Sequence, residues 1–405
     1  MRWCGRADHC AAHRAAWIFL GRIQLTGREG TGLAAADDIR AQALEVAGGW
    51  SPPGAPQSWR LTAALFEAIA ACDELVEHLA ELPPDRLPAL LASAAITFMV
   101  RRDRPVPLAD YIPEPAAPQP PFDEGFFPAF GAFCAAHLEE IVDVCRSHRY
   151  QMNEVARCTQ IALGIAATSG ESPDPIVLVD LGTGAGLGLQ LDRYRYRIGG
   201  GTYGPAAARL SLTCDIRGAY QPPPARLPHI AGRFGVDLNP VDLEDQQARA
   251  WLEACAPPEA SALSRLATAI DVARRHPVRI VAGDVIDELP AMLGSIPGGQ
   301  RLIVVDAYMA VFLAEQRRAR LADVLAEAGR GRPVTWLSLD PLVPLGPSGR
   351  DSVQGLTLPA SLVRDYQRDG VFAVLGARTF HGTTDRGRLL ARAHPSGSWV
   401  EWLSP

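Results

Sequence analysis

Three glycines at alternate positions follow an apolar run near the middle of the chain. The run "IVLVDLG" ends in Asp180 and Gly182, and Gly184 and Gly186 come next. Glycines after a strand let the backbone approach a ligand closely, and the start of a following helix offers free N–H groups. The spacing is G-x-G-x-G with an acid two positions earlier, which differs from the G-x-G-x-x-G of nicotinamide-binding turns. By itself, such a turn is also compatible with a purely structural role.

Three later units repeat the pattern of a strand followed by an acid. They are "GVDLNP" with Asp237, "AGDV" with Asp284 and "VVDAYMAV" with Asp306. With the glycine turn, these units resemble, in order, the motifs of class I S-adenosylmethionine-dependent methyltransferases. The resemblance implies that S-adenosylmethionine binds at Asp180 and the glycines, with Asp237 accepting bonds from both ribose hydroxyls. It also implies that Asp284 receives the adenine amino group and that Asp306 lies beside the transferred methyl.

An insert separates the glycine turn from the "GVDLNP" unit and adds a second candidate for the ribose acid. The insert, at about 197–232, contains the strand-like run "ARLSLTCDIRG", which includes Asp215. We favour Asp237 over Asp215 because "GVDLNP" opens a helix, as the methyltransferase motif does.

Aromatic side chains close to these motifs could face the sulfonium of the cofactor. The candidates are Tyr194, Tyr196, Tyr203 and Tyr308, and a cation against an aromatic face is worth about 0.5–2 kcal/mol. The alternative is that the tyrosines of "RYRY" pack against the sheet edge. We expect Trp399 and Trp402 to be packing residues of the core or an edge.

Polar residues precede the glycine turn by the length of one helix. Asn153 and Glu154 could lean over the amino-acid end of the cofactor, or they could cap a helix and face solvent. A guanidinium can bind a carboxylate through two parallel hydrogen bonds. We expect at most one of Arg157, Arg193 and Arg195 to do so.

The composition excludes several other kinds of site. The chain of 405 residues has a net charge of −6, and all 39 of its basic residues are arginine, so nucleic-acid binding is not expected and no lysine can form a Schiff base or bind phosphate. The eight cysteines include no C-x-x-C pair, which predicts reduced thiols in the cytoplasm and no metal site. No apolar run is long enough to span a membrane.

The elements that must position these residues change in type along the chain. Residues 1–50 show little pattern and 51–170 read as a helical lid segment, interrupted by "LPPD" where Pro83 and Pro84 restart the chain. In 171–405, strands alternate with helices, which predicts a Rossmann-like, mostly parallel α/β sheet. The last strands predict an antiparallel C-terminal edge.

A second resemblance extends from about Trp59 to the C-terminus. The runs "NEVARC", "DLGTGAGLGLQLDRYRY", "GVDLNPVDL", "GDVIDELPAML" and "GSWVEWL" resemble the actinobacterial family called domain of unknown function 2332. The pattern of that family has serine at Gly184 and asparagine at Gly188, so this chain is nearer the methyltransferase consensus. The label implies a methyltransferase-like fold and no particular reaction.

Three functions are compatible with this sequence. The first is methyl transfer from S-adenosylmethionine to a small-molecule acceptor. The second is cyclisation of the cofactor itself, as in azetidine-2-carboxylate synthases, with Asn153 holding the amine, Tyr194 or Tyr196 caging the sulfonium, and methylthioadenosine released. The third is a non-catalytic binding protein on the same fold. Methyl transfer is our first expectation, by analogy with the commonest chemistry of this core; the oligomeric state is left open.

Overall fold

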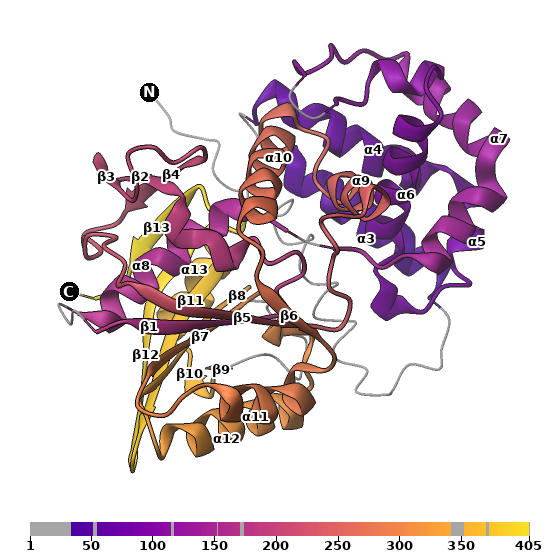
Figure 1. Ribbon diagram of the computed structural model, residues 1–405. Helices are drawn as coiled ribbons and strands as arrows, with labels where there is room; N and C mark the ends of the chain where they lie inside the picture. The colour runs from indigo at the N-terminus through magenta and orange to yellow at the C-terminus, as the bar shows by residue number, and fades with distance from the viewer. Residues whose placement is uncertain are drawn as a thin grey trace.

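The first part of the protein is a group of helices, drawn from indigo to magenta in Figure 1. The computed structural model describes residues 34–51, 55–114, 117–151, 153–170, 174–341, 352–369 and 372–404. The helices of this part are α3 (Ala36–Trp50), α4 (Arg60–Ala71), α5 (Asp73–Leu79), α6 (Pro88–Arg102) and α7 (Phe126–Ser147). Their apolar faces meet in one core, which includes Ile39, Leu65, Leu75, Ile96 and Phe130. We call residues 36–147 the helical segment.

The helical segment begins earlier than the sequence pattern predicted. Residues 1–33 lie outside the described part, but 36–50 form helix α3 rather than an extension without pattern. Ile39, Ala43 and Ala47 recur every four residues and are buried in the core. Two of these three residues are alanines, so the apolar stripe is weak in the sequence and does not predict a helix here.

The predicted restart of the chain at the double proline is present. Pro84 begins a single 3-10 turn, Leu87 takes a left-handed φ of 55°, and Pro88 starts helix α6. Proline is favoured at the first position of a helix because that N–H has no partner within the helix. The short 3-10 helices are η1 (Gln57–Trp59), η2 (Pro84–Arg86), η3 (Pro107–Asp110), η4 (Val155–Arg157), η5 (Gly188–Arg193) and η6 (Ala310–Phe312).

The second part is built on a sheet of eleven strands among the described residues. The order across the sheet is β3-β2-β4-β13-β12-β11-β8-β7-β1-β5-β6. The strands are β1 (Ile176–Leu181), β2 (Arg195–Ile198), β3 (Gly201–Tyr203), β4 (Ser211–Arg217), β5 (Ile230–Asp237), β6 (Arg279–Ala282), β7 (Arg301–Ala307), β8 (Val334–Pro341), β11 (Ala373–His381), β12 (Thr384–Ala393) and β13 (Trp399–Trp402). A separate two-stranded ribbon pairs β9 (Ser352–Val353) with β10 (Leu356–Thr357).

Five neighbouring strands have the order of a doubly wound fold. Strands β6, β5, β1, β7 and β8 are all parallel, and their order corresponds to 3-2-1-4-5. The central strands β1, β7 and β8 are buried along almost their whole length because both faces of the sheet are covered there. Strand β5 lies on one side of β1 and β7 on the other. The carboxyl ends of β1 and β7 therefore form the point where strand order reverses, where ligands bind in open α/β sheets.

The C-terminal strands are antiparallel, as predicted, but they do not form the edge. Strand β11 pairs antiparallel with β8 and with β12, and β12 pairs antiparallel with β13. The insert then extends the sheet, because β4 pairs in parallel with both β13 and β2. The edge is therefore β3, from the insert. Of the ten neighbouring pairs six are parallel, so the fold is a mixed α/β sheet, mostly parallel, with helices at its N-terminal side.

Helices cover both faces of the sheet, as Figure 1 shows. One face packs against α11 (Val285–Ser295) and α12 (Glu315–Gly329), and the other against α8 (Cys158–Ser169) and α10 (Ala260–Arg275). The remaining helices are α9 (Gln246–Ala254) and α13 (Ala360–Asp369). Trp251 of α9 belongs to the core of the helical segment and donates its indole N–H to the Arg149 carbonyl at 2.8 Å. Helix α9 therefore joins the two parts of the molecule.

Two further features bear on the sequence predictions. Among the described residues, no helix has the length and apolar character needed to cross a membrane. Six of the eight cysteines lie in the described ranges, and none of them is in a disulfide.

Candidate functional site

The glycine turn lies at the carboxyl end of β1, and all three glycines have left-handed φ angles. They are 70° at Gly182, 56° at Gly184 and 71° at Gly186. A Cβ at Gly182 would meet the Met309 side chain at 2.6 Å. A Cβ at Gly184 would lie 3.0 Å from the Asn153 Oδ1 atom. The turn therefore requires glycine for its backbone, and Gly184 is the position where the polar segment before β1 comes closest.

The segment after the turn differs from the prediction. In place of an α-helix, the six-residue 3-10 helix η5 follows, and the chain then enters strand β2 at Arg195. The residues of "RYRYRI" alternate between buried and more exposed positions, which is the period of a strand. The argument from the free N–H groups of a long helix therefore does not apply here.

Asp180 is buried beneath the glycine turn, and its carboxyl group has a raised pKa. Its Oδ2 atom accepts the Thr183 hydroxyl at 2.7 Å, and a Cβ at Gly188 would approach the same oxygen to 2.8 Å. Burial, opposed by the Thr183 hydrogen bond and aided by the charge of Asp237, raises the pKa of Asp180 to about 7. This carboxyl group therefore exchanges its proton near neutral pH.

The two candidates for the ribose acid lie in different places. Asp237 ends β5 beside the turn, where its two oxygens accept the N–H groups of Gly184 at 2.8 Å and Asn239 at 2.7 Å. Asp215 is exposed on β4, pairs with Trp399 of β13, and is separated from β1 by five intervening strands in the sheet order. The structure therefore brings Asp237, and not Asp215, to the glycine turn.

The other two strand-end acids already have partners. Asp284 caps α11 through the Ile286 N–H at 2.9 Å and forms an ion pair with Arg317 at 2.6 Å. Asp306 is fully buried on the face that α11 and α12 cover, where it accepts the Trp336 indole N–H at 2.6 Å. Burial, reinforced by the nearby Asp340, raises the pKa of Asp306. Asp306 therefore lies on the opposite face of the sheet from Asp180.

Three of the four candidate tyrosines are buried, and the fourth, Tyr203, is half-buried on β3. Tyr194 donates its hydroxyl to the Leu187 carbonyl at 2.8 Å and Tyr196 to the Leu191 carbonyl, and both rings are in the core. These two tyrosines hold η5 against β2 and line neither of the cavities described below. Tyr308 has a left-handed φ of 67°, and the Arg157 guanidinium lies 3.7 Å from its ring centre.

The polar segment before β1 covers the glycine turn. Gln151 donates to the Asn239 carbonyl at 3.1 Å, and the Asn153 amide lies over Gly184. The Glu154 carboxylate caps η4 by accepting the Ala156 N–H at 2.9 Å. Arg157 is 7% exposed and donates its Nε–H to the Pro395 carbonyl at 2.8 Å. This segment thus places an amide, a carboxylate and a buried guanidinium beside the turn.

Of the three arginines that could bind the carboxylate of the cofactor, only Arg157 lies beside the glycine turn. Arg193 donates to the Gln190 side chain at 3.0 Å, and Arg195 donates to the Ala206 carbonyl at 3.1 Å.

Two adjoining cavities are formed around this segment. The switch-point cavity, of about 80 Å³, lies at the ends of β1 and β7. Its wall includes Asn153, Arg157, Asp180, Gly182, Val305 and Ala307. The helical-side cavity, of about 520 Å³, lies between the helical segment, α9 and α10, and the turn between β12 and β13. Both cavities share Asn153, Glu154, Val155 and Arg157, so a small cavity and a large one adjoin along one short segment.

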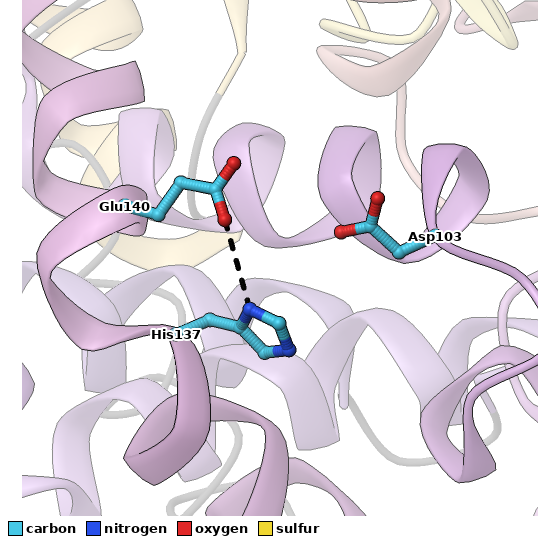
Figure 2. A group of neighbouring side chains, drawn as sticks. All are labelled: Asp103, His137 and Glu140. Carbon is cyan, nitrogen blue, oxygen red and sulfur yellow. Dashed lines mark ion pairs between the residues drawn. The ribbon is translucent and has the colours of Figure 1, made fainter.

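A third group of polar side chains, in the helical segment, is not part of this site. Figure 2 shows Asp103, His137 and Glu140, whose ligand atoms all lie within 4.8 Å of one another. Arg102 already contacts both carboxylates, at 2.6 Å from Asp103 and 2.8 Å from Glu140. One arginine thus offsets part of the charge of the two acids, and the group links α6 to α7.

Several site residues could not be identified from the sequence. The helical-side cavity is lined by Trp50, Trp59, Arg217 and Trp399, which come from distant parts of the chain. Gln151 has no local motif. The strand period of "RYRYRI", in contrast, was a readable signal that Tyr194 and Tyr196 point inward.

Comparison with protein families identifies the chain by its sequence. The model of domain of unknown function 2332, described as an uncharacterized protein conserved in bacteria, matches residues 45–402. The chain belongs to this family. The comparison with curated proteins returned no match.

Proposed function

We propose that this member of the family binds S-adenosylmethionine at the switch-point cavity and transfers its methyl group to a small molecule in the helical-side cavity. The observation that carries the proposal is the shared wall of the two cavities, made by Asn153, Glu154, Val155 and Arg157. Two substrates that exchange a group must meet, and adjoining cavities at a strand-order switch point allow this.

The groups around the switch-point cavity fit the ends of S-adenosylmethionine. Asp180 and Glu154 offer acceptors for an ammonium, and Arg157 offers a buried guanidinium for a carboxylate. The φ of Gly184 and the closeness of Asn153 leave no room for a large side chain there. When bound, the cofactor would supply an electrophilic methyl group on a sulfonium.

The switch-point cavity is small, so it suits the amino-acid end of S-adenosylmethionine. Groups beside the cavity suit the ribose and the adenine. Asp237 retains lone pairs for ribose hydroxyls after accepting its two backbone hydrogen bonds. Leu238, the next residue, is 65% exposed and offers an apolar surface for a purine. Asp284 would bind an adenine amino group only through lone pairs that Ile286 and Arg317 leave open.

The residues of this chain would hold the acceptor and move its proton. Glu154 is the carboxylate that lines both cavities, so it is placed to accept a proton from an acceptor group. The apolar walls of the helical-side cavity would exclude water from the reacting atoms. Helix α9, which joins the helical segment to the sheet, would keep the two cavities together.

Cyclisation of the cofactor has less support from the geometry. That reaction needs no second substrate, so it gives no role to a 520 Å³ cavity. It also needs an aromatic cage for the sulfonium, and the hydroxyls of Tyr194 and Tyr196 donate to backbone carbonyls while their rings lie in the core. Of Tyr194, Tyr196 and Tyr308, only Tyr308 is near the segment, and the Arg157 guanidinium covers its ring at 3.7 Å.

Incubation with S-adenosylmethionine and mass analysis of the products tests the proposal. With the cofactor alone, we expect little product beyond the slow background. When a pool of small molecules is added, we expect adenosylhomocysteine and one compound heavier by a methylene. Methylthioadenosine formed from the cofactor alone, at a rate proportional to enzyme, would replace methyl transfer by cyclisation. Binding without any product under both conditions would favour a non-catalytic protein.

A further inference from the structure

The walls of the helical-side cavity are apolar and partly aromatic. On the side of the helical segment they include Trp50, Trp59, Phe66 and Leu90. The rings of Trp50 and Trp59 meet edge to face with centres 5.0 Å apart. Trp399 of β13 lies on the opposite side. A cavity of about 520 Å³ with such walls is of the size and character that hold small molecules with an apolar body.

The charged residues of this wall favour an anion. Four arginines line the cavity, namely Arg157, Arg217, Arg265 and Arg392, against the two glutamates Glu154 and Glu401. Four arginines against two glutamates leave an excess of positive charge, and Arg217 is exposed to an incoming ligand, so a ligand with a compensating negative charge is favoured.

Arg217 lies beside a glutamate that already forms an ion pair with another arginine. Glu401 lies opposite Arg217 in the β13–β4 register, but its carboxylate binds Arg392 at 2.7 and 3.0 Å. Arg265, in turn, lies 3.6 Å from Glu154. Among the described residues Arg217 forms no ion pair, and its guanidinium stacks over the Trp399 ring at 4.5 Å. A guanidinium held flat on an aromatic ring presents its N–H groups in the plane, where a carboxylate binds through two hydrogen bonds.

A second polar group opens onto the cavity from α4. Thr62 lines the wall and is 1% exposed, and its hydroxyl has no hydrogen-bond partner among the described residues. Buried hydroxyls are normally hydrogen-bonded. This hydroxyl therefore indicates that the ligand carries a hydrogen-bonding group at the side of the helical segment.

We infer that the helical-side cavity binds an apolar, ring-sized carboxylic acid, with its carboxylate on Arg217 and a hydroxyl or similar group toward Thr62. The inference names the class of acceptor for the proposed methyl transfer and rests on that proposal. A monoanion matches Arg217, which forms no ion pair among the described residues, whereas a doubly charged phosphate would bring an uncompensated charge into an apolar cavity.

Calorimetric titration with 4-(4-hydroxyphenyl)butyrate and its primary amide tests the inference without cofactor. The acid should bind at least about 10-fold more tightly than the amide, because only the acid forms charge-assisted hydrogen bonds. Arg217→Gln should remove this difference. Arg197→Gln is the matched control, since Arg197 is an exposed strand arginine of β2 that lines neither cavity. It should leave both affinities unchanged.

A larger side chain in the wall tests whether the acid binds in the helical-side cavity. Leu90→Trp should block both acid and amide by filling the cavity, while the melting temperature reports whether the fold is retained. Equal affinity for acid and amide, or an Arg217→Gln protein that still prefers the acid, would overturn the inference. So would undiminished binding in a folded Leu90→Trp protein, or no binding of the acid at millimolar concentration.

Repeating the titrations with adenosylhomocysteine separates this inference from the proposed function. Binding of the acid without any binding of adenosylhomocysteine would leave the carboxylate site in place and remove methyl transfer. Binding of adenosylhomocysteine without the acid would do the reverse.

Discussion

Replacement of Asp180 by asparagine should stabilise the protein, and more so as the pH rises. Burial raises the pKa of this carboxyl from 3.8 to about 7, so the folded state holds the proton more tightly than the unfolded state. The stability that this protonated carboxyl contributes to the folded state is fully present below about pH 4 and is lost as the pH rises toward 7. Asparagine keeps an oxygen that can accept the Thr183 hydroxyl but has no proton to lose.

The size of the effect follows from the pKa difference of about three units. At about 1.4 kcal/mol per unit, Asp180→Asn should raise the free energy of unfolding by about 4 kcal/mol at pH 8 and by about 2 kcal/mol at pH 5. Urea unfolding at the two pH values measures both quantities. The control is Thr183→Val, which removes the hydrogen bond that lowers the pKa and should steepen the loss of stability with pH. A gain that is the same at pH 5 and pH 8 would refute the assigned ionisation.

The same carboxyl group links stability to ligand binding. If Asp180 binds the ammonium of the cofactor, it must be ionised in the complex. Adenosylhomocysteine should then bind more tightly at pH 8 than at pH 6 and release a proton, which calorimetry in buffers of different ionisation enthalpy detects. In Asp180→Asn both effects should disappear.

Three further substitutions separate site residues from packing residues. Gly184→Leu should abolish cofactor binding and cost about 1–3 kcal/mol of stability because of its left-handed φ, whereas Gly184→Ser should bind; circular dichroism and calorimetry measure the two effects. Tyr194→Phe should lower the free energy of unfolding by about 1 kcal/mol and leave ligand binding unchanged, and a large loss of affinity in titration would return Tyr194 to the site. Asp237→Asn should weaken adenosylhomocysteine binding about 10-fold or more while Asp215→Asn does not, and the opposite order in calorimetry would reverse the assignment of the ribose acid.

Much of the sheet could be predicted because its signals are local. The runs before Asp180, Asp237, Asp284 and Asp306 are strands, those before Asp180 and Asp306 being the most apolar, and each acid lies at or just after a carboxyl end. Parallel strands with covered faces read as continuous apolar runs, which a single sequence displays. The edge was not predictable in the same way, because the insert joins the sheet through pairing between residues such as Asp215 and Trp399, which are far apart in the chain.

Only the part of the candidate site that a sequence motif forms could be predicted. The glycine turn and Asp237 meet because consecutive units of a doubly wound fold bring their strand ends together. The approach of Asn153 to Gly184 depends on how the chain crosses from the helical segment, for which the sequence has no signal. Trp399, expected to be packing, lines the helical-side cavity because the turn between β12 and β13 folds against the start of α8.

Calorimetric titration of the full chain with adenosylhomocysteine, and in parallel with a nicotinamide dinucleotide, tests the central claim most directly. The account predicts one adenosylhomocysteine per chain, binding retained in Gly184→Ser and lost in Gly184→Leu, and no heat from the dinucleotide. Tight binding of the dinucleotide with none of adenosylhomocysteine, or adenosylhomocysteine binding undiminished in Gly184→Leu, would contradict it.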